Sequence, residues 1–184
     1  MSTYRVAVND RPVVAQLAVV AGFAVAMALS AQVAIPLPGT PVPLTLQPMI
    51  VVLAGLWLSP RAAAASMIAY LTAGALGLPV FAPVGAPGLL RLMGPTGGYL
   101  LAYPLAAAVT SIVARMSASY SRRALACIAG MAVIYAGGLL QLTVITGSVG
   151  SAALLGAAPF LALDLIKAHL AALAAPRRPV SREG

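Results

Sequence analysis

The sequence contains very little charge. Only 8% of its 184 residues are Asp, Glu, Lys or Arg, whereas 61% are hydrophobic. A typical soluble domain carries about 25% charged residues, so this chain cannot cover a globule with polar side chains. The composition excludes a soluble domain, a disordered tail and a nucleic-acid-binding protein as descriptions of the whole chain. It is typical of an integral membrane protein.

Cysteine, histidine and acidic residues are also scarce. Cys127 is the one cysteine, so the chain can form neither an intramolecular disulfide nor a cysteine-based metal site. One histidine and three acidic residues leave few side chains for metal-dependent or acid/base chemistry, and we expect no metal and no cofactor. The sequence has no G-x-x-x-x-G-K-[ST], H-E-x-x-H or G-x-S-x-G motif. We therefore expect no ATP site in this chain and no enzymatic activity.

Long hydrophobic runs, separated by clusters of Pro, Gly, Arg and Ser, predict a single all-α membrane domain with six transmembrane helices. The first run would rise about 33 Å as a helix, enough to cross a hydrocarbon core of ~30 Å. The segments 35–41, 77–98 and 147–158 are the predicted outer loops. The predicted helices span residues 13–34, 42–58, 62–76, 99–114, 124–146 and 159–175.

The positions of the basic residues predict the orientation. With both termini in the cytoplasm, nine of the eleven basic residues lie on the cytoplasmic side, Arg91 lies outside and Lys167 lies within the last helix. The positive-inside rule therefore favours cytoplasmic termini. The basic residues would contact anionic lipid headgroups, and we expect no nucleic-acid partner. The nine residues are Arg5, Arg11, Arg61, Arg115, Arg122, Arg123, Arg177, Arg178 and Arg182.

Asp164 and Lys167 are the most informative residues because both lie inside the last predicted helix. Their spacing of three places them on one helix face, about 7.5 Å and about 12 Å from its outer end. A charge at a helix centre costs about 2.5–3.5 kcal/mol, and pairing lowers that cost. The pair either stabilises the bundle or recognises a ligand that has N–H donors beside a carbonyl or carboxylate. His169 lies about 140° around the helix from Asp164, away from this face.

Arg91 and the glycine-rich turn that follows it are further candidates. Arg91 either contacts a lipid headgroup or pairs with an anionic ligand. The turn at 94–99 opens the fourth predicted helix, whose N-terminus offers free N–H groups and the positive end of a dipole. Gly/Pro turns are also common at helix starts without any ligand. The candidate ligand contacts in this turn are Thr96, Gly97, Gly98 and Tyr99.

The first outer loop is rich in proline. Four prolines within residues 35–43 predict a stiff, extended segment that is either a spacer or a lid over a pocket. Thr45 and Gln47 follow, and they either line that pocket or bond to helix backbone. The aromatic residues interpreted as ordinary members of the interface or the bundle are Trp57, Tyr70 and Tyr103.

The first predicted helix is dense in small residues. Ala18/Gly22 and Ala24/Ala28 have a small-xxx-small spacing, which permits close approach of another helix. This spacing either packs the helix within its own bundle or docks it onto a partner subunit. In the second case Ala15, Ala18 and Gly22 are the candidate contacts.

Taken together and in order, four pieces of the sequence resemble the BioY family, the biotin-binding S components of energy-coupling factor transporters. The resemblance covers about residues 13–175. The segment 81–88 departs from the family's pattern by carrying two prolines. The four pieces are I-P-L-P-G-T-P-V-P-L-T-L-Q at 35–47, L-G-L-P-V-F at 76–81, G-P-T-G-G-Y at 94–99 and P-F with D-x-x-K at 159–167.

The resemblance implies a bundle of six helices in a bacterial cytoplasmic membrane, with biotin bound near the outer face. It implies uptake driven by a transmembrane coupling subunit and two cytoplasmic ATPases, with the first helix contacting the coupling subunit. It also implies that Asp164 and Lys167 contact biotin. We expect Asp164 to accept from a ureido N–H and Lys167 to donate to the ureido carbonyl, while Arg91 or the fourth helix attracts the carboxylate. The alternative is an S component for another vitamin, such as thiamine or riboflavin.

Overall fold

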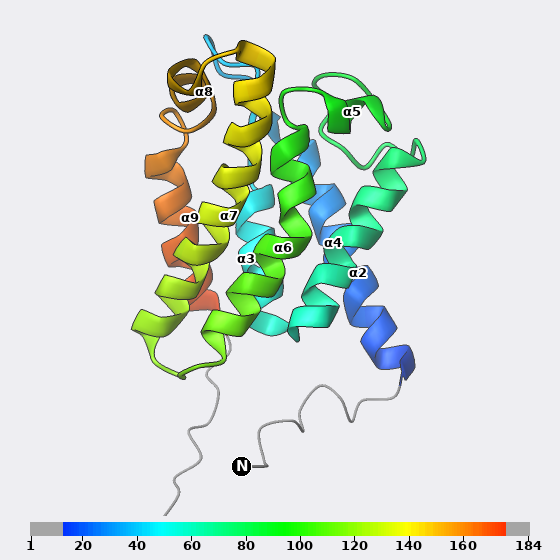
Figure 1. Ribbon diagram of the computed structural model, residues 1–184. Helices are drawn as coiled ribbons and strands as arrows, with labels where there is room; N and C mark the ends of the chain where they lie inside the picture. The colour runs from blue at the N-terminus through cyan, green and yellow to red at the C-terminus, as the bar shows by residue number, and fades with distance from the viewer. Residues whose placement is uncertain (1–12, 176–184) are drawn as a thin grey trace, which may run out of the picture.

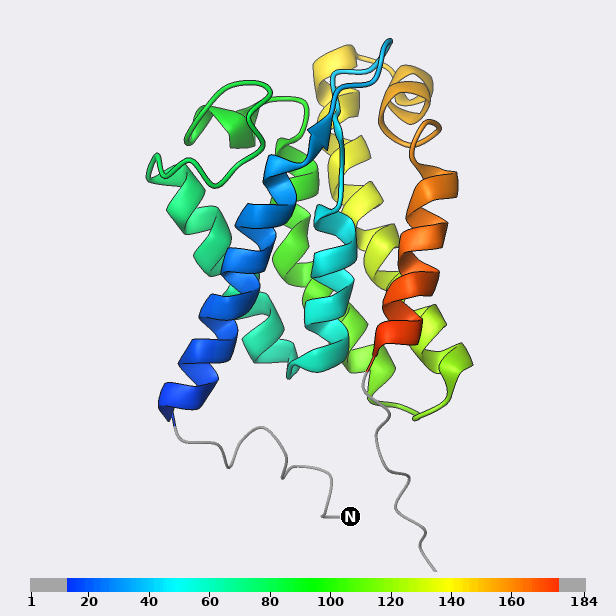
Figure 2. The same cartoon turned by 180° about the vertical axis from the view of Figure 1, so that it is seen from behind.

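The long helices lie side by side and run roughly along one axis (Figure 1, Figure 2). The computed structural model describes residues 13–175. The short elements gather at one end, which we call the loop end: β1 (Ala34–Ile35), β2 (Leu44–Thr45), α5 (Leu90–Met93) and α8 (Val149–Gly156). We call the opposite end, where α2 begins and α9 finishes, the arginine end. The long helices are α2 (Val13–Gln32), α3 (Gln47–Trp57), α4 (Pro60–Ala75), α6 (Gly97–Ala114), α7 (Tyr120–Thr146) and α9 (Leu161–Ala174).

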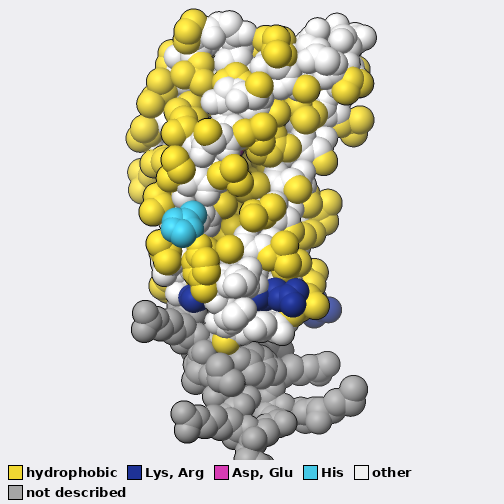
Figure 3. Space-filling model, turned by 90° about the vertical axis from the view of Figure 1, so that its left-hand side faces the viewer, with side chains coloured by type: hydrophobic (Ala, Val, Ile, Leu, Met, Phe, Trp, Pro, Cys, Tyr) yellow, Lys and Arg dark blue, Asp and Glu magenta, His cyan; other side chains and the backbone are white. Residues whose placement is uncertain are grey.

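The expected all-α membrane bundle is confirmed. The helices expected from the sequence correspond in order to α2, α3, α4, α6, α7 and α9. By length and composition α2, α6 and α7 can each cross a membrane, and α8 with α9, bent by 56°, makes a fourth span if the two are counted as one. In the face shown in Figure 3, apolar side chains cover most of the height, and Lys and Arg gather near the arginine end.

The predicted start of the second expected helix, 42–58, is wrong, because α3 begins at Gln47. Residues 42–46 precede α3 and are not helical, and Thr45 pairs with Ala34 in the antiparallel β1–β2 hairpin. Pro43 accounts for Val42, because proline disfavours a helical conformation in the residue before it, and the pairing with β1 holds Leu44 and Thr45 extended. The 11 residues of α3 rise only about 16 Å. The helix therefore occupies roughly half of a ~30 Å span, and the chain above it descends from the loop end as an extended segment (Figure 2).

Short capped turns close the arginine end. The Ser59 hydroxyl accepts from the Ala62 N–H at 3.3 Å and caps α4, with a proline in the first turn. The Ser119 hydroxyl accepts from the Arg122 N–H at 3.2 Å and caps α7 in the same way. Such caps satisfy amide groups that a helix start leaves unpaired. The turns carry Arg61, Arg115, Arg122 and Arg123.

The other basic residues expected on the cytoplasmic side are not described by the structure. Arg5, Arg11, Arg177, Arg178 and Arg182 lie outside the described residues.

Glycines let α6 and α7 approach closely. A Cβ atom added at Gly98 would lie 2.2 Å from the Gly137 carbonyl oxygen, and one added at Gly137 would lie 2.6 Å from the Gly98 carbonyl oxygen. Further along the same helix pair, a Cβ at Gly130 would lie 2.0 Å from the Thr110 hydroxyl. Small residues are what close helix packing in a membrane requires. The contact fixes the position of α6, whose N-terminal turn borders the cavity described below.

The two small-residue pairs of α2 lie on different faces of the helix. Ala24 and Ala28 pack against the core. Ala18 and Gly22 are exposed, and a Cβ at Gly22 would meet no atom within 4 Å. Ala15 is half-buried beside that exposed face. The Ala24/Ala28 pair therefore belongs to the packing of the bundle itself. Ala18 and Gly22 take no part in that packing.

Candidate ligand-binding site

A pocket lies in the loop-end half of the bundle, above the short helix α3. Its empty space, the open solvent at its mouth included, is about 640 Å³. Aromatic rings from several helices and loops form much of its wall. These rings belong to Tyr70, Phe81, Tyr99, Tyr103, Tyr135 and Phe160. The polar side chains in the wall are Thr45, Gln47, Arg91, Thr96, Asp164 and Lys167.

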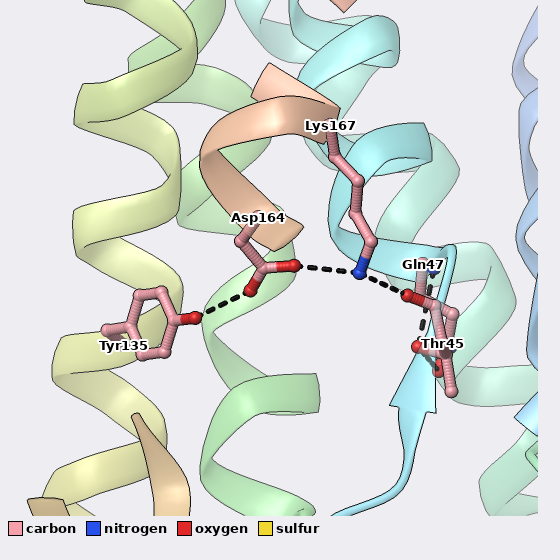
Figure 4. A network of polar contacts seen from close by, with 5 residues as sticks. All are labelled: Thr45, Gln47, Tyr135, Asp164 and Lys167. Atoms are coloured by element: carbon pink, nitrogen blue, oxygen red, sulfur yellow. Dashed lines mark hydrogen bonds and ion pairs between the residues drawn. The ribbon is translucent and has the colours of Figure 1, made fainter. Parts of the chain in front are cut away.

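Asp164 and Lys167 form an ion pair on the pocket-facing side of α9. The Lys167 Nζ lies 2.7 Å from Asp164 Oδ1, and it also donates to the Thr45 carbonyl oxygen at 2.7 Å (Figure 4). Asp164 is 7% exposed and Lys167 is 8% exposed. The expectation that both charges share one helix face is confirmed, and the pair lies at the pocket wall. An ammonium has three donors, so Lys167 keeps one donor beyond these two bonds.

Tyr135 supplies the second hydrogen-bond donor to the Asp164 carboxylate. Its hydroxyl donates to Asp164 Oδ2 at 2.6 Å, and Figure 4 shows it reaching the carboxylate from α7. Each carboxylate oxygen thus has one donor. Sequence reasoning missed Tyr135, although one signal was present. It lies mid-way along α7 in an apolar run, far from the membrane interfaces where tyrosine is common.

Thr45 and Gln47 form a second polar group next to the ion pair. The Gln47 amide nitrogen Nε2 donates to the Tyr70 hydroxyl at 2.7 Å, and Gln47 is 4% exposed. The Thr45 hydroxyl donates to Gln47 Oε1 and accepts from the Gln47 backbone N–H, both at 3.4 Å. Both alternatives from the sequence hold for Thr45, which lines the pocket and bonds to helix backbone. Tyr70, interpreted from the sequence as an ordinary bundle aromatic, is part of the pocket.

Arg91 is buried at the loop end rather than directed at lipid. It is 6% exposed, its Nη2 donates to the Ala82 carbonyl oxygen at 2.6 Å, and its Nη1 donates to the Val84 carbonyl oxygen. Its Nε has no hydrogen-bond partner within the described chain. Burial lowers the pKa of the Arg91 guanidinium, but arginine stays protonated in proteins. A cation therefore stands at the pocket wall, and the lipid-headgroup alternative does not fit its position.

The residues of the glycine-rich turn separate into two kinds. Thr96 and Tyr99 line the pocket, and the Tyr99 hydroxyl donates to the Gly156 carbonyl oxygen at 2.8 Å. Gly97 and Gly98, expected as ligand contacts, are not in the pocket wall. They are buried where a side chain would collide, Gly97 with the Leu92 carbonyl and Gly98 with α7. Their role in the structure is to allow close packing.

The proline-rich loop covers the site instead of standing apart from it. Val42 and Pro43 line the pocket, and the Thr40 hydroxyl donates to the Leu155 carbonyl oxygen of α8 at 2.6 Å. This bond ties the hairpin to α8. Because the loop lies over the pocket and is tied to α8, it corresponds to the lid alternative rather than to the spacer.

His169 lies away from the pocket, as its helical position predicts. It is exposed, and its Nδ1 contacts the Tyr120 hydroxyl. Within residues 13–175 no group of three His, Cys, Asp or Glu side chains is placed to hold a metal ion.

The fold and the pocket define a class: a helical membrane protein with a candidate ligand pocket and an ion pair buried in its wall. The sequence profile of the BioY family matches residues 2–182, nearly the whole chain. This chain belongs to the BioY family.

Individual relatives agree with the family match. A probable biotin transporter BioY of Pyrococcus horikoshii is 37% identical over 162 residues, 88% of this chain and 94% of the relative. The biotin transporter BioY of Thermotoga maritima is 37% identical over 155 residues, 84% of this chain and 90% of the relative. A crystal structure of the S-component for biotin from an ECF-type ABC transporter has the same fold. Its TM-score is 0.80, with 88% of this chain and 89% of that chain covered at 24% identity.

Proposed function

We propose that this protein captures biotin in the loop-end pocket and is the substrate-binding S component for biotin uptake. The observation that carries the proposal is the Asp164–Lys167 pair, a buried donor and acceptor in the wall of a pocket lined by several aromatic rings. The two full-length relatives described above are both named biotin transporters. Their names favour biotin over thiamine or riboflavin.

The chemistry of biotin matches the arrangement of polar groups. Its ureido ring has two N–H groups and one carbonyl, and its bicyclic body and tail are apolar. Asp164 keeps lone pairs that can accept from a ureido N–H, and Lys167 keeps a donor for the ureido carbonyl. The aromatic wall would contact the ring system and the tail. Arg91, or the N-terminus of α6 beside Thr96, would attract the carboxylate.

Uptake needs an energy source, and we propose that partner subunits supply it. The sequence has no Walker-type phosphate loop, so an energising module would consist of a transmembrane coupling subunit and cytoplasmic ATPases. The exposed face of α2 that carries Ala18 and Gly22 is a suitable surface for the coupling subunit. Small residues permit close helix contact, and Ala15 would lie at the edge of that contact.

The proposed setting is a bacterial cytoplasmic membrane, with the loop end outside and both termini in the cytoplasm. Arg61, Arg115, Arg122 and Arg123 all lie at the arginine end, which supports a cytoplasmic location for that end under the positive-inside rule. The pocket would then open toward the outer side and receive biotin from there.

The test is a titration of biotin, thiamine and riboflavin into the detergent-solubilised protein. We expect saturable binding of biotin and no binding of thiamine or riboflavin. Replacing Asp164 with Asn should weaken biotin binding at least about tenfold, because a hydrogen bond to a charged group is worth about 1.5–3 kcal/mol. His169→Gln, on the same helix but outside the pocket, is the matched control. Unchanged biotin affinity in Asp164→Asn would contradict the proposed role of this residue.

A further inference from the structure

Tyr135 is held in a fixed position beside the ion pair. It comes from α7, whereas Asp164 and Lys167 come from α9 (Figure 4). Its ring meets the Tyr99 ring edge to face, with centroids 6.5 Å apart and planes at 79°. Tyr99 is in turn anchored to α8 through its hydroxyl. The ring contact and the hydrogen bond to Asp164 Oδ2 together hold Tyr135 against the ion pair.

The donors around Asp164 satisfy its negative charge before any ligand enters. The Lys167 ammonium is paired with Oδ1 at 2.7 Å, and the Tyr135 hydroxyl donates to Oδ2 at 2.6 Å. Both are charge-assisted hydrogen bonds, which are stronger than bonds between neutral groups. Asp164 is nearly buried, so little water is available to replace either donor. The carboxylate still accepts hydrogen bonds, but it does not need a second cation.

We propose that Tyr135 is a positioning residue that makes the site select an uncharged head group over a cationic one. The inference rests on the proposed biotin-binding function and concerns the same pocket. A neutral urea uses the lone pairs that remain on Asp164. A cationic head group there would face Lys167, a like charge at close range, without an unsatisfied carboxylate oxygen to compensate. Removing the Tyr135 hydroxyl leaves Oδ2 without its donor, and a cationic ligand then gains more than a neutral one.

The test compares biotin with 2-iminobiotin, in which a cyclic guanidine replaces the urea. Both are titrated into the wild-type protein and Tyr135→Phe, at a pH where the guanidine is protonated. We expect the wild type to prefer biotin at least about tenfold, and Tyr135→Phe to reduce that preference about tenfold, as expected for one bond to a charged group. Desthiobiotin, a neutral urea, is the control ligand. Its affinity relative to biotin should be the same in both proteins.

The matched control is Tyr120→Phe, which removes a hydroxyl from the first turn of the same helix, where it contacts His169. It should leave every ratio unchanged. Equal weakening of all three ligands in Tyr135→Phe would mean that Tyr135 only shapes the pocket, and the inference fails. A wild type that binds protonated 2-iminobiotin as tightly as biotin overturns it without any variant. A wild type that binds no biotin overturns the proposed function itself, which is a different result.

Discussion

The loop-end half and the arginine-end half of the bundle are built on opposite principles. The loop-end half is hollow, because α3 is short and an extended hairpin takes the place of its missing turns. The arginine-end half is filled, with Gly130 against Thr110 and the Ser111 hydroxyl donating to the Leu58 carbonyl oxygen at 2.7 Å. One set of helices therefore leaves a pocket in one half, while the other half supplies the packing that holds the helices together.

The hydrogen bonds of the two halves also differ in what they join. At the arginine end, Arg115 and Ser111 both donate to one backbone carbonyl, that of Leu58, and Arg123 donates to the Ala175 carbonyl oxygen at 3.1 Å. These bonds join helix ends. In the loop-end half, Tyr135, Asp164 and Lys167 bond to one another in the wall of an open space, which leaves donor and acceptor capacity for a ligand.

The largest effect should follow from removing the paired cation of the pocket, Lys167. Lys167→Met removes the donor proposed for the ureido carbonyl. It also leaves Asp164 buried without its ionic partner, which costs about 3–5 kcal/mol of folding free energy in buried pairs. We expect biotin affinity to fall at least about a hundredfold, measured by titration calorimetry. The matched control is Arg122→Met, which removes a cation from the filled half and should leave affinity unchanged. If the two variants bind biotin equally well, the halves do not differ in function as described.

A smaller effect, on stability rather than binding, should follow from overfilling the packed half. In Gly130→Ala the new Cβ would lie 2.0 Å from the Thr110 hydroxyl, and such overpacking typically costs about 1–3 kcal/mol. We expect a lower midpoint of thermal unfolding in detergent. Gly22→Ala is the matched control, since no atom lies within 4 Å of its Cβ, and it should be neutral or slightly stabilising. Equal midpoints for the two variants would contradict the packing argument.

The smallest effect should appear only when the partner subunits are present. Ala18→Leu enlarges a side chain on the exposed face of α2, so biotin binding by the isolated protein should persist. Uptake by cells that express the energising module should fall about tenfold, the equivalent of about 1.4 kcal/mol of lost association. Ala132→Leu, exposed on α7, is the control and should not reduce uptake. Equal uptake by both variants would remove α2 as the docking surface.

Much of the fold and part of the site could be predicted from the sequence. Hydrophobic runs separated by Pro, Gly and Ser place the helices, because each span must be apolar over its length. Asp164 and Lys167 stand out because charge inside a span is expensive. The start of α3 was misplaced because hydrophobicity alone does not distinguish an extended apolar segment such as 42–46 from a helical one.

Other site residues could not be assigned from local pattern. Gly97 and Gly98 have the composition of an anion-binding turn, yet their surroundings leave no room for a side chain beside Leu92 and α7. Tyr70 looks like an ordinary aromatic in the sequence, and the mid-helix position of Tyr135 does not reveal its partner. Their hydroxyls become part of the pocket only because α4 and α7 bring them to Gln47 and Asp164.

The sequence by itself determined that this is an apolar helical bundle, that its basic residues favour one orientation, and that one ion pair lies within its last helix. These follow from the free energy of placing each residue type in a membrane, which depends on the residue and its depth. The tertiary structure alone decided which small residues of α2 face outward, which tyrosines meet the ion pair, and where the cavity lies. Those features depend on distances between helices far apart in the chain, and no local pattern encodes them.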